Sequence, residues 1–267
     1  MRNKSFWNKR DGSDSRPTLK RTSKARVRRI DSREPIVIEI DGTEIVRDAY
    51  RGRTDLRHVI IPEGVTHIGT SAFYGCKRLK SVTLPSTLQS LGDYAFHGCK
   101  HLKSILIPEG VSNIGRRAFG DCKSLRSVTL PGDLVNFGSA AFGGCYALEY
   151  SYYEGGRYLG NARNPHLVCV KGAAELHPDT GIVASGAYAM SGIKHIIINS
   201  GVEHIGSLAF LRSRVEYIYI PHSIREIDAD AFMECDALVN VSYNGTMDEW
   251  NTVYKGNAVP VSTTDSE

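Results

Sequence analysis

The sequence of 267 residues has no run of 18 or more apolar residues, so it predicts no membrane-spanning helix. It also lacks the short motifs of common active sites: G-x-S-x-G, a phosphate-binding loop, G-x-G-x-x-G and H-E-x-x-H are all missing. Its acidic residues form no recurring pair. These absences favour a protein that is not an enzyme, and we expect neither catalytic residues nor a cofactor.

The six cysteines form no C-x-x-C pair and have no histidine at a zinc-site spacing, so no metal site is expected. Four of them recur at intervals of 23 residues: Cys76, Cys99, Cys122 and Cys145. In stacked repeats their side chains would point the same way, which is the wrong arrangement for disulfide bonds. We therefore expect buried free thiols.

The N-terminal segment is strongly basic. Residues 1–34 hold twelve Lys and Arg against four Asp and Glu, a net charge of +8, which leaves −4 for the rest of the chain. With few apolar residues and no periodicity, residues 1–35 are expected to form a disordered basic tail. A nucleic-acid or anionic-surface arm and a plain solvated tail both fit this composition. The segment contains no apolar h-region of a secretory signal.

The most informative feature that the sequence does contain is an internal repeat of 23 residues. Proline, phenylalanine and leucine each recur at this interval, and the unit reads approximately I-P-x-G-V-x-x-I-G-x-x-A-F-x-G-C-x-x-L-x-S-V-x-L. The columns are Pro62, Pro85, Pro108 and Pro131; Phe73, Phe96, Phe119 and Phe142; and Leu79, Leu102, Leu125 and Leu148.

The register continues less regularly on both sides. Ala49-Tyr50 stands upstream, and Ala189-Met190, Ala209-Phe210 and Ala231-Phe232 are interpreted as further Ala-Phe pairs, which gives eight units. A coil of this length cannot bury its own apolar face, whereas stacked coils share one continuous core. The segment from Leu79 to Leu84 predicts a short strand, so equivalent strands of successive coils should pair in parallel.

These columns resemble the BspA-like leucine-rich-repeat family. The resemblance rests on Ile61-Pro62-Glu63-Gly64-Val65, Ile68-Gly69, Ala72-Phe73, Gly75-Cys76 and Leu79 with their repeats, and it covers about residues 36–254. It implies a right-handed leucine-rich-repeat solenoid with a stacked parallel β-sheet, formally α/β but mostly β. It also implies a surface or secreted protein that takes part in adhesion, although the residues themselves leave the compartment open.

The resemblance and the repeat spacing together predict five segments. A disordered tail (1–35) precedes a regular repeat block (36–153), an inserted β-hairpin (154–178), a degenerate repeat block with a C-terminal cap (179–254) and a second disordered tail (255–267). Tyr158-Leu159-Gly160-Asn161 resembles the hairpin often found between repeat blocks of the family, and Tyr243-Asn244-Gly245-Thr246 with Trp250 resembles its closing motif. A binding role and a purely structural role both remain open for the hairpin.

The outward-facing strand positions change character along the chain. In the regular block they are mostly small and polar, whereas later ones are aromatic or apolar. Exposed aromatic clusters with few charges are typical of binding patches, although tyrosines can also pack on one another across a sheet or cover the hairpin. The candidate ligand-binding residues are Tyr150, Tyr152, His195, Ile197, Tyr217 and Tyr219.

A second candidate surface is basic. Arg57, Lys80, Lys103 and Arg126 share one repeat position, here called the basic stripe, and Lys77, Lys100 and Lys123 share another. Such a stripe could contact an acidic glycan or protein, or it could be a solvated edge that discourages aggregation.

The sequence therefore favours a non-catalytic binding scaffold with a protein or glycan ligand, a monomer being the favoured state. The alternative is a protein that binds nucleic acid or an anionic surface through its basic tail. Nucleic acid is the less favoured partner, because a short basic segment is a weak signal of nucleic-acid binding.

Overall fold

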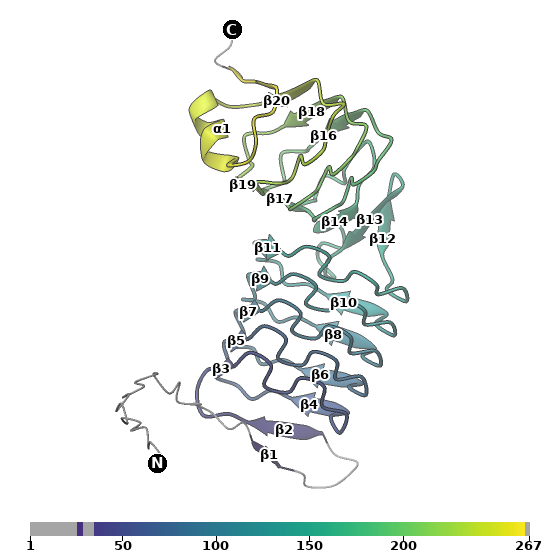
Figure 1. The fold of residues 1–267 in the computed structure, drawn as a ribbon, viewed down its shortest axis with the longest axis vertical. Helices are drawn as coiled ribbons and strands as arrows, with labels where there is room; N and C mark the ends of the chain where they lie inside the picture. Colours follow the sequence, from purple (N-terminus) through teal and green to yellow (C-terminus); the bar gives the residue numbers. More distant parts are fainter. Residues whose placement is uncertain (1–25, 29–34, 265–267) are drawn as a thin grey trace, which may run out of the picture.

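The computed structural model describes residues 26–28 and 35–264 of the chain. It is an elongated stack of coils that runs from the N-terminal repeats to the single helix of the described region (Figure 1). Each regular coil contributes one short strand to each of two sides of the stack. The fold is thus a mostly β solenoid with parallel strands, as the repeat predicted.

The first side is built from strands that begin 22 or 23 residues apart. β2 pairs in parallel with β4, β4 with β6, and β8 with β10, so that equivalent residues such as Val59 and Val82 lie opposite each other. An additional strand, β1, pairs antiparallel with β2. The strands are β1 (Arg26–Arg28), β2 (Ile36–Glu39), β4 (His58–Ile60), β6 (Ser81–Thr83), β8 (Ser104–Leu106) and β10 (Ser127–Thr129).

The second side is a ladder of two-residue strands that the sequence did not reveal. Their inward residues, such as Ile68 and Leu91, are buried, and their outward residues face solvent. A two-residue strand is too short to show alternation in sequence. The strands are β3 (Glu44–Ile45), β5 (His67–Ile68), β7 (Ser90–Leu91), β9 (Asn113–Ile114) and β11 (Asn136–Phe137).

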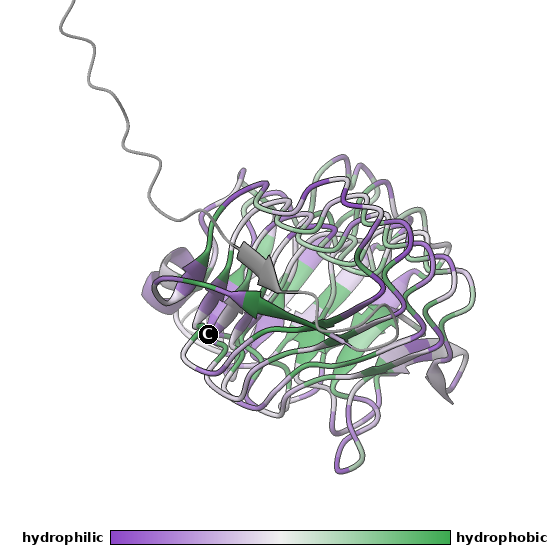
Figure 2. Cartoon of the chain, turned by 90° about the horizontal axis from the view of Figure 1, so that it is seen from below, coloured by the Kyte–Doolittle hydropathy of each residue, from purple (hydrophilic) through white to green (hydrophobic). Residues whose placement is uncertain are grey.

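A column of aromatic rings runs through the core between the two sides. Tyr50, Phe73, Phe96, Phe119 and Phe142 stack with centroids 4.9–5.3 Å apart and interplanar angles of 10° or less. A view along the stack shows hydrophobic segments on the strands and on the turns between them, and hydrophilic segments along the outer turns (Figure 2). The coils therefore bury their rings against one another, not within themselves.

The segment expected to form an inserted hairpin contains two antiparallel strands, β13 (Gly156–Leu159) and β14 (Val168–Lys171). β12 (Ser151–Tyr153) pairs antiparallel with β13. On its other edge β14 pairs in parallel with β15 (Ile182–Val183), which is followed by β17 (His204–Ile205) and β19 (Glu226–Ile227). The hairpin therefore becomes the first member of the second side in the C-terminal block.

The first side of the C-terminal block consists of β16 (His195–Ile197), β18 (Tyr217–Ile220), β20 (Asn240–Tyr243) and β21 (Val261–Ser262), all parallel. Helix α1 (Met247–Val253) then closes the stack. Thr246 and Glu249 form a capping box at its N-terminus, and Trp250 is buried.

Two expectations about the C-terminal half were wrong. The core ring is Tyr188, which is buried and stacks on Phe210 at 5.3 Å, whereas Met190 is 76% exposed. The rings Tyr188, Phe210 and Phe232 follow one another at 22 residues, so the block keeps a regular but shorter repeat.

Residues 255–267 are not simply a disordered tail, because Val261 and Ser262 form β21 against β20 and bury its edge. Most of the expected basic tail, 1–25 and 29–34, lies outside the described residues, while Arg26–Arg28 form β1.

Glycine at one corner lets adjacent coils approach closely, which predicts a position-specific effect of alanine. A Cβ on Gly92 would lie 2.7 Å from the Thr70 backbone nitrogen and 2.8 Å from the Gly69 carbonyl carbon. We expect Gly92→Ala to destabilise the fold by about 1–3 kcal/mol, because rigid backbone must move apart. Urea unfolding followed by circular dichroism measures the change.

Gly192→Ala is the matched control, because its Cβ would meet nothing within 4 Å and its φ is not positive. It should leave stability unchanged or raise it by about 0.4–1 kcal/mol. If both substitutions changed the free energy of unfolding equally, the close approach of adjacent coils at Gly92 would not be what requires glycine there.

Candidate functional site

Four of the predicted ligand-binding residues lie together on the outward side of β16 and β18. His195 lies opposite Tyr217 and Ile197 opposite Tyr219, and the rings of His195 and Tyr217 are 5.2 Å apart. Ile197 is 62% exposed, Tyr217 44% and Tyr219 38%. We call these four residues the aromatic face.

The local sequence explains why these side chains point outward. Between them, Ile196, Ile218 and Ile220 are buried in the core, and residues alternate between the two faces of a strand. Asn240 and Ser242 continue the surface on β20, where Asn240 Nδ2 donates a hydrogen bond to Ser262 Oγ at 2.9 Å. Lys194 and Glu216 precede the two strands directly and form an ion pair, with Nζ and Oε1 2.7 Å apart. The face itself contains no Asp, Glu, Lys or Arg.

Tyr150 and Tyr152 do not belong to this face. Tyr150 is half-buried and packs against the core of the regular block, and burial raises the pKa of its hydroxyl. Tyr152 is 66% exposed on β12, in a different sheet from β16. The physical reason is Ser151, a polar residue at a core position, where the chain leaves the first side and β12 pairs with β13.

The basic stripe forms a continuous column, as the repeat spacing predicts. The Lys80 backbone N–H donates to the Arg57 carbonyl at 2.7 Å, Lys103 donates to Lys80 at 3.3 Å, and Arg126 donates to Lys103 at 2.8 Å. All four side chains are exposed. Within residues 35–264 no carboxylate forms an ion pair with Lys80, Lys103 or Arg126. The stripe ends at Glu149, whose N–H donates to the Arg126 carbonyl at 2.8 Å.

The cysteines are free, and all are buried except Cys235, which is half-buried, so the expectation of structural thiols is confirmed. In the repeat column each S–H donates to the carbonyl of the core ring residue one coil earlier, for example Cys76 to Tyr50 at 3.1 Å. Burial raises the pKa of the Cys76 thiol to about 11 and that of Cys169 to about 12. These groups are protonated at neutral pH and are therefore poor nucleophiles.

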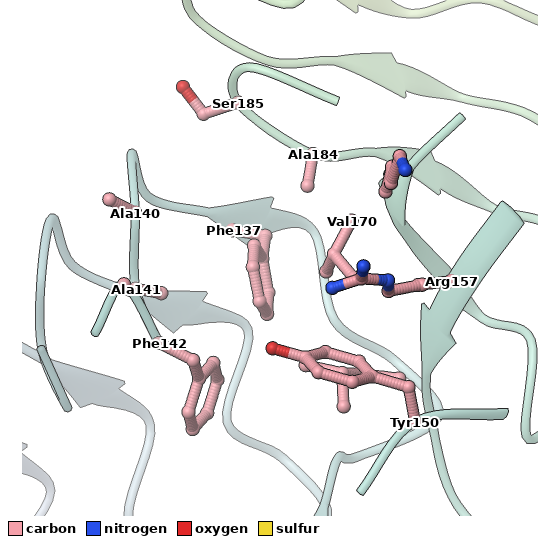
Figure 3. Close-up of a pocket in the computed structure, with 12 residues that line it drawn as sticks. Phe137, Ala140, Ala141, Phe142, Tyr150, Arg157, Val170, Ala184 and Ser185 are labelled. Carbon is pink, nitrogen blue, oxygen red and sulfur yellow. The ribbon is translucent and has the colours of Figure 1, made fainter. Parts of the chain in front are cut away.

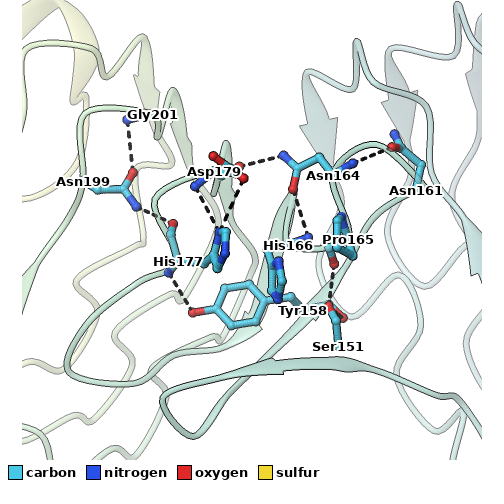
Figure 4. Close-up of polar contacts among 10 residues, drawn as sticks. All are labelled: Ser151, Tyr158, Asn161, Asn164, Pro165, His166, His177, Asp179, Asn199 and Gly201. Atoms are coloured by element: carbon cyan, nitrogen blue, oxygen red, sulfur yellow. Dashed lines mark hydrogen bonds and ion pairs between the residues drawn. The ribbon is translucent and has the colours of Figure 1, made fainter.

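Polar contacts join the hairpin to both repeat blocks (Figure 4). Toward the regular block, Asn161 Nδ2 donates to the Leu130 carbonyl at 3.1 Å. Toward the C-terminal block, Asn164 Nδ2 donates to the Asp179 carbonyl at 2.7 Å. The His166 and His177 rings stack at 3.8 Å, and the His177 N–H donates to the Tyr158 hydroxyl at 3.3 Å. The hairpin thus connects the two blocks physically.

No group of three or more potential metal ligands occurs in the part of the chain that the structure describes. None of the helices described there is long and apolar enough to cross a membrane. Cavities lie where the repeat blocks end, and the sequence predicted none of them.

Parallel coils, two strand ladders and a core column of stacked rings define a leucine-rich-repeat solenoid. The family model of the BspA type leucine rich repeat region matches in six copies, over residues 34–157 and 175–253. The chain therefore belongs to this family. No curated protein matches it by sequence.

Several solved structures are similar to this chain. A leucine rich cell surface protein from Faecalibacterium prausnitzii is 21% identical, with 83% of this chain and 88% of that chain covered and a TM-score of 0.33. The T. pallidum leucine rich repeat protein is 22% identical, with 88% and 96% covered and a TM-score of 0.44. The pneumococcal vaccine antigen PcpA is 14% identical, with 89% and 96% covered and a TM-score of 0.39.

The stacked histidines generate a pH prediction. Burial, followed by the neighbouring His177, lowers the pKa of His166 in the fold below its ordinary value of 6.5, and Asp179 opposes this effect. Because the folded state disfavours protonation, its stability is fully present above about pH 6.5 and declines as the pH falls below that value. We expect His166→Gln to show a smaller loss of stability between pH 7.5 and 5.5 than the parent chain.

Thermal unfolding at both pH values measures the difference. His101→Gln, which removes an exposed histidine of the regular block, is the control and should keep the parental pH dependence. If the stability of His166→Gln falls with pH as much as that of the parent chain, His166 does not cause the loss of stability at low pH.

Proposed function

We propose that this chain is a non-catalytic binding scaffold whose aromatic face contacts a protein or glycan ligand. The observation that carries the proposal is the contiguity of His195, Ile197, Tyr217 and Tyr219 on one exposed sheet surface. Aromatic side chains contribute large contact areas with few rotatable bonds, and interface cores are depleted of charge. Adhesion at a cell surface is the proposed setting, and the similar F. prausnitzii protein is a leucine rich cell surface protein.

The alternative, nucleic-acid binding through the basic N-terminal segment, rests on residues that lie mostly outside the described region. No contact in the described region favours it.

Loss of the tyrosines should weaken binding. We expect Tyr217→Ser with Tyr219→Ser to reduce affinity at least tenfold, because truncation of a central interface aromatic costs about 2 kcal/mol or more. Binding is measured by surface plasmon resonance against immobilised fibronectin, laminin and collagen, and on a glycan array. Circular dichroism checks that the variant is folded.

Leu106→Ser is the control, because Leu106 is also an outward strand residue, 65% exposed, but belongs to the regular block. It should bind like the parent chain. A double tyrosine variant that is folded and binds with parental affinity would rule out the aromatic face. Failure of the parent chain to bind any of these probes would contradict the adhesion setting.

The basic stripe is proposed as a second contact surface, for an acidic glycan, because its cations stack without carboxylate partners in the described region. Lys80→Glu with Lys103→Glu should lower the salt concentration at which the protein elutes from heparin, since the attraction is electrostatic and screened by salt. Lys194→Glu with Lys255→Glu, which changes the net charge by the same amount at exposed positions outside the stripe, should cause a smaller shift. Equal shifts would indicate a response to net charge alone.

A further inference from the structure

The stack of core rings is interrupted between the two repeat blocks. Ring contacts in the described region proceed from Tyr50 to Phe142 and resume with Tyr188 and Phe210. Phe142 and Tyr188 are 46 residues apart, two repeat lengths of 23, so one ring is missing between them. The hairpin occupies that interval but supplies no ring to the column.

A cavity of about 170 Å³ lies at this interruption. Phe137, Phe142 and Tyr150 line it from the regular block, Arg157 and Val170 from the hairpin, and Ala184 from the C-terminal block (Figure 3). A cavity of about 150 Å³ lined by apolar side chains is large enough for benzene. The space therefore suits one ring-sized apolar group.

Backbone donors are left over at the same place. In the regular coils the N–H groups of Ser71 and Phe73 donate to carbonyls of the next coil, those of Asp93 and Ala95, at 2.8 and 2.7 Å. This pattern repeats through Arg117 and Phe119. The equivalent N–H groups of Ala140 and Phe142 have no hydrogen-bond acceptor among the described residues, and both residues line the cavity. By the repeat geometry they point toward the missing coil.

Two cations lie at the cavity as cross-strand neighbours. Arg157 on β13 lies opposite Lys171 on β14, and like charges placed directly opposite destabilise a strand pair. Within the described residues neither forms an ion pair, and no carboxylate lines the cavity. Arg157 instead lies over the Tyr150 ring, 5.9 Å from its centroid. A bound anion would compensate both charges.

The C-terminal end of the stack provides a comparison. There the cavity beside the last Phe of the column, Phe232, is lined by Asp230, Glu234 and Asp236 and by no lysine or arginine. Interruption of the ring column therefore coincides with a cavity beside the last ring of each block, and of these two cavities the one beside Phe142 is basic. Its charge comes from the hairpin and not from the repeat.

From these observations we infer that the cavity between the repeat blocks binds a small aromatic carboxylate. The ring of the ligand packs against Phe137, Phe142 and Tyr150 in place of the missing core ring. Its carboxylate accepts hydrogen bonds from the free N–H groups and from Arg157 or Lys171, and charge-assisted hydrogen bonds of this kind are strong. This site is separate from the aromatic face, so the inference is independent of the proposed function.

The test uses benzoate as the probe and the full chain at pH 7.5, with isothermal titration calorimetry for affinity. Benzamide, the neutral analogue, and acetate, which lacks the ring, should each bind at least tenfold more weakly than benzoate. Glucuronate tests a non-aromatic acidic ring. Tighter binding of glucuronate, equal binding of benzamide, or no binding of benzoate would each overturn the inference.

Variants locate the site. Arg157→Gln and Lys171→Gln should each weaken benzoate binding at least threefold, whereas Arg163→Gln, elsewhere in the hairpin, should stay within twofold of the parent chain. Val170→Phe fills the cavity and should abolish binding. Both glutamine variants alter exposed side chains, so they keep the test decisive even if Val170→Phe does not fold.

Amide NMR spectra give an independent readout. Benzoate should shift the N–H signals of Ala140 and Phe142, and leave those of Tyr217 and Tyr219 unchanged. Shifts confined to the aromatic face, or parental affinity in both glutamine variants, would show that benzoate binds elsewhere and that the inference is wrong.

Discussion

The contact between successive coils is the interaction on which the rest of this structure depends. Each central ring, such as Phe96, is fully buried only because the rings of the coils on either side cover both of its faces. Glycine at the corners allows this approach, since backbone atoms of the neighbouring coil occupy the space that a Cβ would need at Gly69, Gly92 and Gly115. Stability therefore comes from the repeated inward residues, which leaves the outward residues free to differ from coil to coil.

The same constraint makes a break in the stack costly. A coil without a successor exposes a ring and leaves backbone N–H groups without acceptors, and buried unpaired donors are unfavourable. The hairpin repairs part of this defect: Gly160 accepts a hydrogen bond from the Leu130 N–H at 2.9 Å, and β14 begins the second ladder of the C-terminal block. It does not replace the missing ring or the acceptors for Ala140 and Phe142. The insertion therefore joins the blocks and also creates a cavity that no regular repeat contains.

The sequence predicted those parts of the fold that repeat at a constant interval. The ring, leucine and cysteine columns of the regular block follow directly from their identical spacing. The sequence indicates Met190 and not Tyr188 as the core residue, because the interval becomes 22 residues and the Ala189-Met190 pair mimics the motif. The repeat spacing predicts an outward Tyr150, but the chain changes sheets at Ser151 and the spacing no longer applies. The two-residue strands, β21 and the cavity depend on contacts between coils and leave no local pattern in sequence.

Two surfaces of different chemistry follow from this division of the stack. The regular block presents stacked cations, whose attraction acts over roughly 8 Å at physiological salt and weakens as salt is added. The C-terminal block presents aromatic and aliphatic side chains, whose contribution comes from buried area and depends little on salt. Because the hairpin is hydrogen-bonded to Leu130 on one side and Asp179 on the other, the two surfaces are held on one connected framework. A ligand that engages both must carry its acidic and apolar groups in separate regions along the axis of the stack, whereas a ligand with only one kind of group can use only one block.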